Sequence, residues 1–197
     1  MNKAARVGVY GGTFDPIHRT HLEIAQAAMR HAALDQVIFV VAARPPHKRG
    51  EVFASAEDRL AMVEALVSVE PGMAASRMEL DREGPSYTVD TLRDLQSAHP
   101  GAALYLIVGY DTLIDLPKWR DPQGVLDRAR LLVVPRPDAP EPVPAVLDGH
   151  FEFIPFPEST VSSTEIRERL AAGESVADCV PAPVVALIQE RGLYAHR

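Results

Sequence analysis

One stretch near the start of the chain limits the fold more than any other, because an apolar run gives way to two glycines and then to a helical pattern. Residues 7–10 are apolar and short, as in a buried strand, and residues 22–30 place apolar side chains at helical spacing. Gly11 and Gly12 stand between them and let the backbone approach a ligand closely. The sequence therefore predicts a strand, a glycine turn and a helix, which is the first half of a βαβ unit.

The start of that helix favours an anion. Its first N–H groups have no partners within the helix, and its dipole is positive there. His18 and His21 are three residues apart, so they share a helical face if the helix has begun by then, and each can donate to a phosphate oxygen. A purely structural turn stays open, because both common phosphate fingerprints are absent. A metal site on the two histidines is less favoured, since no Cys or carboxylate lies nearby at ligand spacing.

Residues 11–21, GGTFDPIHRTH, resemble the G-[GS]-[TS]-F-D-P-x-H-x-G-H signature of the nucleotidyltransferase superfamily. The resemblance implies that His18 and His21 hold the phosphates of ATP and stabilise the transition state of adenylyl transfer. It also implies that other residues of the motif contact the two substrates. Those for ATP are Gly11, Gly12, Thr13 and Phe14, and Asp15 contacts the second substrate, the acceptor of the adenylyl group. Thr20 departs from the signature, which has glycine there, and its side chain could bond a phosphate, cap the helix or crowd the nucleotide.

Composition narrows the class of protein. The 197 residues, 47% of them hydrophobic, suffice for one core with a small appendage, and the net charge of −7 argues against a broad nucleic-acid surface. The lone Cys179 excludes an intramolecular disulfide, and no apolar run reaches the length of a membrane helix. Residues 1–6 leave no room for a signal peptide before the first strand. We therefore expect a cytoplasmic protein without nucleic-acid or membrane partners, and a homo-oligomer stays open.

Residues 37–42 are apolar and β-branched, as in a second strand that is covered on both faces. Ligands of parallel sheets lie at the carboxyl ends of strands, so the basic loop 44–49 that follows is placed to contact an anion, although a solvated turn is the alternative. This loop also resembles the P-P-H-K segment of adenylyltransferases that act on nicotinate mononucleotide. The resemblance implies that His47 and Lys48 bind the mononucleotide.

Further strands and helices alternate along the chain. Strands are predicted at 73–80, 104–109, 131–134 and 151–154, and helices at 60–67 (capped by Ser55), 89–95, 112–116, 123–129 (capped by Asp121), 162–172 and 181–191. The fold class is therefore predicted as α/β, with a Rossmann-like, mostly parallel sheet and helices on both faces. A small helical part over about 160–197 completes a single domain, 1–197.

Two stretches indicate where the acceptor binds. Ser86 and Thr88, read alone, are ordinary helix caps, but with Tyr87 they resemble an S-Y-T-x-x-T motif whose backbone and hydroxyls face a pyridine ring and its carboxylate. Trp119, read alone, is a core residue or a half-buried anchor. The resemblance implies that Trp119 stacks on the nicotinate ring.

Two strand ends carry further polar candidates. Gly109 and Asp111 follow the strand at 104–109, where a carboxylate can accept from a ribose hydroxyl of ATP or cap the next helix. Arg136 follows the strand at 131–134, and its planar fork suits a phosphate or carboxylate of the acceptor.

A second helix start carries hydroxyls and an arginine. Ser162 and Glu165 form a capping box, and three consecutive hydroxyls at a helix start also suit a phosphate. The stretch resembles an I-S-S-T-x-[IL]-R motif that holds the ATP polyphosphate. The resemblance assigns this role to four residues, Ser162, Ser163, Thr164 and Arg167.

These motifs, in this order, resemble those of the nicotinate mononucleotide adenylyltransferases. The implied reaction joins ATP and nicotinate mononucleotide into nicotinic acid adenine dinucleotide, with pyrophosphate as the second product. Mg²⁺ is expected to arrive with ATP, because no set of carboxylates is arranged to hold it. Transfer to another phosphorylated acceptor such as phosphopantetheine, cytidylyl transfer, and a nucleotide-binding regulator weakened at Thr20 are the alternatives.

Overall fold

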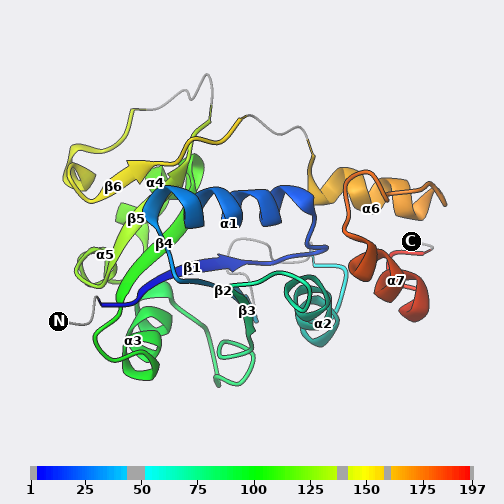
Figure 1. Cartoon of the computed structure of the whole chain (residues 1–197), viewed down its shortest axis with the longest axis horizontal. Helices are drawn as coiled ribbons and strands as arrows, with labels where there is room; N and C mark the ends of the chain where they lie inside the picture. Colours follow the sequence, from blue (N-terminus) through cyan, green and yellow to red (C-terminus); the bar gives the residue numbers. More distant parts are fainter. Residues whose placement is uncertain (1–3, 44–51, 137–141, 158–160, 196–197) are drawn as a thin grey trace. The chain divides into compact units, whose positions relative to one another are not determined.

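The computed structural model describes residues 4–43, 52–136, 142–157 and 161–195 (Figure 1). Strands and helices alternate along the first two thirds of the chain, as the sequence predicts. The strands are β1 (Arg6–Gly12), β2 (Gln36–Val41), β3 (Met73–Ser76), β4 (Ala103–Gly109), β5 (Ala129–Val134) and β6 (Phe151–Phe153). The helices are α1 (Arg19–Ala32), α2 (Ala56–Val67), α3 (Thr88–Ala98), α4 (Tyr110–Asp115), α5 (Pro122–Leu126), α6 (Ser163–Ala171) and α7 (Ala182–Arg191), with short 3-10 helices η1 (Leu116–Lys118) and η2 (Ala145–Leu147).

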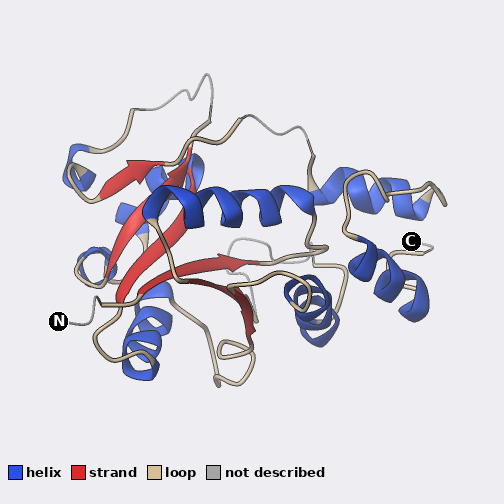
Figure 2. Ribbon diagram, viewed as in Figure 1, coloured by secondary structure: helices blue, strands red, loops and turns tan. Residues whose placement is uncertain are grey.

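The strands of the described residues form a six-stranded sheet in the order β3-β2-β1-β4-β5-β6. β1 pairs with β4, β4 with β5 and β5 with β6, all in parallel, with Val7 opposite Leu104 and Leu104 opposite Ala129. Figure 2 shows β4, β5 and β6 running side by side. The predicted α/β class and Rossmann-like sheet are therefore confirmed. Sheets with this strand order bind ligands at the carboxyl ends of their strands, near the point where the order reverses.

Two compact units divide the chain, and each combines three stretches that are far apart in sequence. The first unit comprises Met1–Gly11, Ile24–Ile38 and Ser86–Glu158; the second comprises Gly12–Glu23, Phe39–Pro85 and Ser159–Arg197. In the first unit, α1 and α3 lie on opposite faces of the strands (Figure 1). In the second unit, α2 packs against α7. The single domain over 1–197 stays a prediction.

The core follows from strands that are apolar on both faces. Most residues of β2 and β5 are fully buried, as expected for parallel strands covered by helices on both sides. Gly8 in β1 shows how tightly the first unit packs, because a Cβ added there would lie 2.8 Å from Leu34 and 2.9 Å from Val37. The absence of a side chain at this position lets the α1–β2 connection lie against the strand.

Three predicted helix starts and one helix end are confirmed by their capping bonds. The hydroxyl of Ser55 accepts from the Asp58 N–H at 3.0 Å, and the Asp121 carboxylate accepts from the Gly124 N–H at 3.0 Å. The hydroxyl of Ser162 accepts from the Glu165 N–H at 3.2 Å, so Ser162 is the N-cap of α6. Gly192, with φ of 60°, ends α7 in the left-handed region that glycine tolerates.

Other predicted boundaries were wrong for physical reasons. The strand predicted at 73–80 ends at Ser76, because the N–H groups of Leu80 and Asp81 turn back to the Arg77 carbonyl. The helix predicted at 123–129 ends at Leu126, because Ala129 already pairs with Leu104 as the start of β5. Sheet pairing thus overrides the local helical pattern.

Two predicted caps were also wrong. Tyr87, rather than Ser86 or Thr88, is the N-cap residue of α3, and it makes no side-chain cap bond. Gly109, rather than Asp111, is the N-cap residue of α4. Asp111 is the second residue of α4, and its carboxylate has an ion-pair partner instead.

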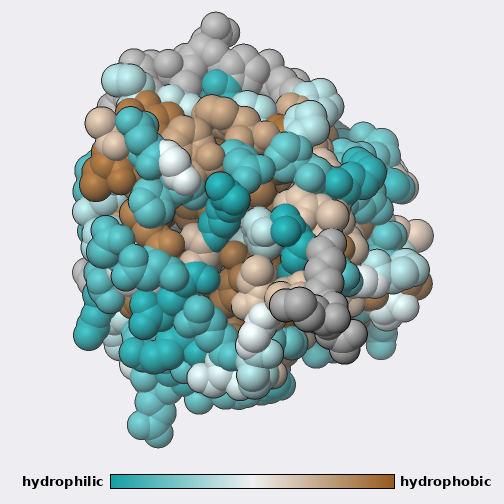
Figure 3. Space-filling view, turned by 60° about the vertical axis from the view of Figure 1, so that its left-hand side comes forward, coloured by the Kyte–Doolittle hydropathy of each residue, from teal (hydrophilic) through white to brown (hydrophobic). Residues whose placement is uncertain are grey.

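Hydrophilic side chains cover much of the face shown in Figure 3, with smaller hydrophobic areas among them. The large hydrophobic residues that are exposed in the described part of the chain are Phe53, Val69, Val146 and Phe153. Among those residues, no helix combines the length and the apolar character needed to cross a membrane.

Candidate functional site

The glycine loop, residues 11–18, connects β1 to α1 and is tightly folded. A Cβ added to Gly12 would lie 2.7 Å from the Phe14 ring, so only glycine fits there without a shift of the loop. Phe14 itself has φ of 51° and is buried, with its ring edge-on to His21 and Phe39 at centroid distances of 5.2 and 5.6 Å. The Phe14 ring therefore packs against His21 and, at 3% exposure, offers almost no surface to a ligand.

His18 and His21 lie together at the start of α1, with ring centroids 3.9 Å apart. The main-chain N–H of His18 donates to Nδ1 of His21 at 3.3 Å. Because Nδ1 accepts, a neutral His21 carries its proton on Nε2 and can donate from there. Thr20, between them, is buried in the first turn of α1 and is not the helix cap.

His18 is a buried histidine with an orphaned nitrogen. Its side chain is 4% exposed, and its Nδ1 has no hydrogen-bond partner. Burial lowers the pKa of His18 from 6.5 to about 4, so the ring is neutral near pH 7. An unpaired polar atom in the interior costs free energy, and a ligand that supplies the missing partner recovers it. The orphaned nitrogen makes His18 a candidate partner for a polar ligand.

Arg167, one turn into α6, is fixed beside the glycine loop within the second unit. Its Nη1 donates to the Asp15 carbonyl at 2.8 Å and its Nη2 donates to the Thr164 hydroxyl at 3.1 Å. The guanidinium carbon lies 4.4 Å from the centre of the Phe53 ring. These contacts hold the guanidinium in one orientation. A cation that is already oriented can bind an anion without first having to rearrange.

The hydroxyls at the start of α6 divide into two kinds. Ser162 and Thr164 accept hydrogen bonds, so their own hydrogens stay available for an anion. Ser163 donates to the Pro16 carbonyl at 3.2 Å and thereby fastens α6 to the glycine loop. The sequence treats all three alike, and the structure separates them.

Asp15 is 4% exposed, and its carboxylate is fully engaged inside the second unit. It accepts from the N–H groups of Phe53 at 2.7 Å and Ala54 at 3.1 Å, and from the Tyr194 hydroxyl at 2.7 Å. These contacts favour a structural anchor, whereas acceptor binding by Asp15 stays a prediction.

In the first unit, Asp111 and Arg136 contact each other. Arg136 Nη1 lies 2.7 Å from both carboxylate oxygens of Asp111, and both side chains are more than half exposed. Parallel pairing of β4 with β5 explains the contact, because it brings the carboxyl ends of these strands to the same edge. Such an exposed pair is weak and is easily exchanged for a ligand.

Another group in the first unit lies at the start of α3 and the end of η1. The Arg120 guanidinium lies 4.5 Å from the centre of the Tyr87 ring, and Trp119 beside it is partly exposed. Ser86 and Thr88 flank Tyr87 and are half-buried. The structure therefore brings the serine–tyrosine–threonine motif close to the segment that carries the tryptophan.

The remaining predicted residues are open positions or lie outside the described ranges. Gly11 and Gly109 are exposed, and a Cβ at either would meet nothing within 4 Å. Thr13 is half-buried, and its carbonyl accepts from Arg59 at 2.8 Å. His47 and Lys48 lie outside the described residues.

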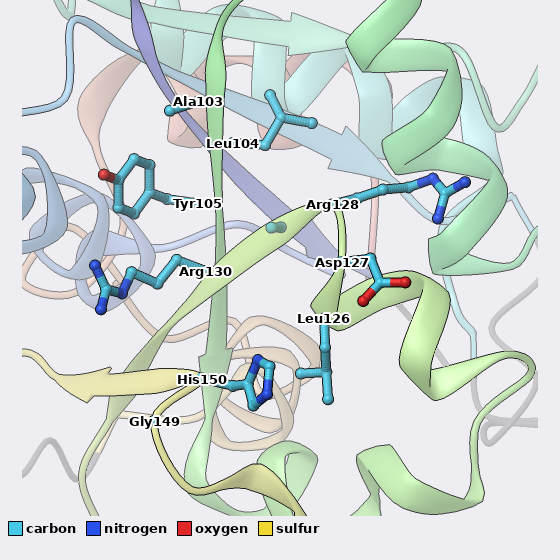
Figure 4. Close-up of a pocket in the computed structure, with 10 residues that line it drawn as sticks. Ala103, Leu104, Tyr105, Leu126, Asp127, Arg128, Arg130, Gly149 and His150 are labelled. Carbon is cyan, nitrogen blue, oxygen red and sulfur yellow. The ribbon is translucent and has the colours of Figure 1, made fainter.

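Two cavities differ in what lines them. One, of about 310 Å³, lies in the first unit at the amino ends of β4 and β5, opposite to the edge that binds ligands in parallel sheets. There Arg128 and Arg130 point away from each other (Figure 4). The other, of about 380 Å³, lies in the second unit and is lined by Phe53, Thr164, Arg167, Glu168, Ala171, Gly192, Leu193, Tyr194 and Ala195. Only the second includes predicted site residues.

Sequence reasoning missed Arg59, Arg120 and the anchoring role of Tyr194. Arg59 lies on the buried face of α2, beside Met62 and Val63, and an arginine on an apolar helical face was the available signal. Nothing in the sequence indicates the contact of Arg120 with Tyr87, because the two are distant in the chain.

The geometry suits an anion. The second unit joins the neutral His18 and the neighbouring His21 to an oriented arginine and two available hydroxyls, all of them donors that can bind phosphate. The described residues contain no group of three or more histidine, cysteine or acidic side chains that could hold a metal ion.

Known proteins resemble the chain over nearly its whole length. The profile of the cytidylyltransferase-like family matches residues 9–169. A protein of Gloeobacter violaceus named "Probable nicotinate-nucleotide adenylyltransferase" is 43% identical over 96% of both chains. A protein of Thermus thermophilus with the same name is 44% identical over 96% of this chain and 99% of its own. The solved nicotinic acid mononucleotide adenylyltransferase of Plasmodium falciparum is 17% identical, with a TM-score of 0.77 over 96% of this chain and 97% of its own, and supports the fold.

Proposed function

We propose that this chain, which belongs to the nicotinate-nucleotide adenylyltransferase family of cytidylyltransferase-like proteins, transfers the adenylyl group of ATP to nicotinate mononucleotide. The products are nicotinic acid adenine dinucleotide, an intermediate of NAD biosynthesis, and pyrophosphate. The observation that carries the proposal is the buried His18, neutral and with an orphaned Nδ1, beside His21 at the start of α1. In relatives of 43 and 44% identity, the name records this same activity.

The reaction needs no covalent intermediate on the protein. An oxygen of the mononucleotide phosphate attacks the α-phosphorus of ATP, and the bond from that phosphorus to the oxygen bridging to the β-phosphate breaks. Pyrophosphate leaves with the electron pair of that bond. A phosphate monoester is already ionised near pH 7, so no strong base is required. The protein contributes position and charge neutralisation.

Each phosphate-binding residue has a distinct task in this scheme. His18 and His21 donate from their rings to oxygens of the ATP phosphates, His21 from its Nε2. Arg167 neutralises charge from the orientation that Asp15 and Thr164 give it. Ser162 and Thr164 donate through their hydroxyls, and main-chain N–H groups of the loop from Gly11 to Phe14 complete the cradle. Ser163 keeps α6 in place through its bond to Pro16.

The acceptor is recognised by the residues of the first unit and by the basic loop. Trp119 stacks on the pyridine ring, and Ser86, Tyr87 and Thr88 bind its carboxylate at the start of α3. Arg120 supports this group through the Tyr87 ring. Asp111, with Gly109, accepts from a ribose hydroxyl of ATP, and Arg136 exchanges Asp111 for an anionic group of the acceptor. His47 and Lys48 add positive charge.

A divalent metal, Mg²⁺, accompanies ATP in this proposal and neutralises charge on its phosphates. A cation that is bound mainly by phosphates and water requires few protein ligands. That requirement fits the described residues, whose acidic side chains form no cluster suited to a metal. Location in the cytoplasm and assembly into a homo-oligomer stay predictions.

The test is release of pyrophosphate from ATP and Mg²⁺ with three acceptors in parallel: nicotinate mononucleotide, nicotinamide mononucleotide and phosphopantetheine. We expect turnover mainly with the nicotinate form. Turnover with another acceptor keeps the adenylyl transfer and overturns the substrate assignment. If the protein binds ATP but turns over none of the three acceptors, it is not an active enzyme, and a nucleotide-binding regulator is favoured. Thr20→Gly, which brings in the glycine of the signature, is then the first variant to test for turnover.

A further inference from the structure

Two charged side chains, which the scheme above gives no contact with the phosphates, are buried in the second unit. Arg59 in α2 is 1% exposed, and Asp15 in the glycine loop is 4% exposed. Buried charges are costly unless they are paired and hydrogen-bonded, so their partners define what they do. Burial lowers the pKa of Arg59, and the charge of Asp15 partly offsets that effect. The hydrogen-bond partners of both side chains belong to the second unit, so the cluster can be described within that unit alone.

Arg59 clamps the glycine loop to the end of β2. Its Nη1 donates to the carbonyls of Thr13 and Ala42, both at 2.8 Å, and its Nη2 lies 3.4 Å from the Ala43 carbonyl. One guanidinium thus joins a carbonyl of the glycine loop to carbonyls at the end of β2.

Asp15 joins the loop to two C-terminal segments at once. Its carboxylate accepts from the Tyr194 hydroxyl at 2.7 Å, and its carbonyl accepts from Arg167 Nη1 at 2.8 Å. A single residue of the loop therefore contacts both the tail after α7 and the arginine of α6. The Tyr194 hydroxyl therefore donates to the residue whose carbonyl orients the arginine.

Tyr194 is held in an unusual conformation. Its φ of 65° lies in the left-handed region, which few residues other than glycine adopt, and such strain persists where the surroundings enforce it. Burial and the negative charge of Asp15 raise the pKa of Tyr194, so its hydroxyl stays protonated and keeps donating. The Met62 sulfur lies 3.9 Å from the same hydroxyl. The bond to Asp15 is therefore a specific contact of the tail.

The geometry points to Tyr194 as a positioning residue for adenylyl transfer: its hydroxyl holds Asp15, and through Asp15 it fixes the guanidinium of Arg167. The inference rests on the proposed function for its reaction and goes beyond it in naming a residue that touches neither substrate. The tail after α7 acts on the phosphate-binding residues from behind the loop, at the cavity of about 380 Å³ that Tyr194 and Arg167 both line.

The test is a double-mutant cycle between Tyr194→Phe and Arg167→Ala, measured on kcat with nicotinate mononucleotide and on affinity for a non-hydrolysable ATP analogue. Tyr194→Phe should lower kcat about tenfold, because it removes one hydrogen bond to a charged group. In the Arg167→Ala background the same change should lower kcat less than about twofold, because the group it positions is gone. A structural role alone would give equal losses in both backgrounds, and that result overturns the proposal.

The control is Tyr105→Phe, which removes the hydroxyl of a buried tyrosine in β4 of the first unit. Its kcat should stay within about twofold of wild type. A value of kcat for Tyr194→Phe that matches this control also overturns the proposal. Asp15→Asn serves as the second variant, because it weakens the same link from the other side and should show the same dependence on Arg167.

Failure of the proposed function gives a different pattern. If wild type binds the ATP analogue and turns over none of the acceptors, the reaction is wrong, and the cycle is read from affinity alone. Tyr194→Phe should then weaken binding of the analogue only where Arg167 is present. Equal weakening in both backgrounds overturns the positioning role irrespective of the reaction.

Discussion

Several polar residues around the glycine loop of the second unit are buried or fixed by several partners, whereas the Asp111–Arg136 pair of the first unit is exposed and weakly held. Asp15, His18 and Arg59 are at most 4% exposed, and Arg167 has two hydrogen bonds and a ring contact. Asp111 and Arg136 are 68% and 56% exposed and form an ion pair with each other at the surface. The contrast matches two tasks: charge in a transition state is best met by fixed groups, whereas an acceptor can be met by side chains that adjust.

Replacing His18 by alanine should have the largest effect on turnover among the substitutions in the second unit. We expect turnover to fall about a thousandfold, because the variant removes a donor placed for charge that develops on phosphate. The measurement is the rate of pyrophosphate release, with circular dichroism to show that the fold is kept. His31→Ala at the other end of α1 is the matched control and should keep near-normal turnover. Near-normal turnover of His18→Ala would remove His18 from the site.

Replacing Arg59 by methionine should destabilise the glycine loop without removing any side chain that is assigned to the phosphates. The variant leaves the carbonyls of Thr13 and Ala42 without a donor and the Asp15 charge without its buried counterpart. We expect a loss of about 4 kcal/mol in the free energy of unfolding. Urea denaturation measures it, with the exposed Arg93→Met as control. A loss below about 1 kcal/mol would show that the clamp is dispensable.

Lowering the pH should weaken the second unit through His18. Its pKa is about 4 when folded against an ordinary value of 6.5, so between these values the unfolded chain binds a proton that the folded chain does not. Stability present above pH 6.5 is therefore lost as the pH falls towards 4, by about 3 kcal/mol for this group. Urea midpoints of wild type and His18→Gln, compared at about pH 7, about pH 5.5 and about pH 4.5, isolate the contribution. Parallel pH profiles for both proteins would contradict it.

Replacing Trp119 by alanine tests the adjustable side of the comparison. We expect KM for nicotinate mononucleotide to rise about tenfold with kcat little changed, because stacking contributes to binding in the ground state and the transition state alike. Trp119→Phe keeps an aromatic face, so its KM for nicotinate mononucleotide should lie between those of the wild type and Trp119→Ala. A fall in kcat at constant KM would instead place Trp119 among the groups that act on the transition state.

Breaking the Asp111–Arg136 pair should have the smallest effect on stability. Both side chains are more than half exposed, so Asp111→Asn should change the free energy of unfolding by less than about 0.5 kcal/mol. If the carboxylate binds a ribose, Asp111→Asn should also raise KM for ATP. The binding free energy lost should then exceed the change in the free energy of unfolding. A stability loss above about 1 kcal/mol would mean that this pair is as firmly held as the second unit's cluster.

The sequence by itself determined the succession of strands and helices and the residues that gather at helix starts. Periodicity and capping are local, so the neighbouring residues alone suffice to identify Ser55, Asp121 and Ser162 as caps. The prediction that His18 and His21 bind phosphate also rests on their position after a strand and a glycine turn. Local signals failed where pairing decided, as at Ala129, which continues a helical pattern yet begins β5.

Only the tertiary structure shows which polar residues are taken up by partners inside the protein. The carboxylate of Asp15 and the hydroxyl of Ser163 are taken up by partners that lie far away in sequence, and the low pKa of His18 comes from burial. The supporting roles of Arg59 and Tyr194 arise for the same reason, because no pattern within the chain indicates their bonds to the glycine loop. A sequence shows which donors and acceptors exist, but their pairing across long separations is set by the packing of the whole unit.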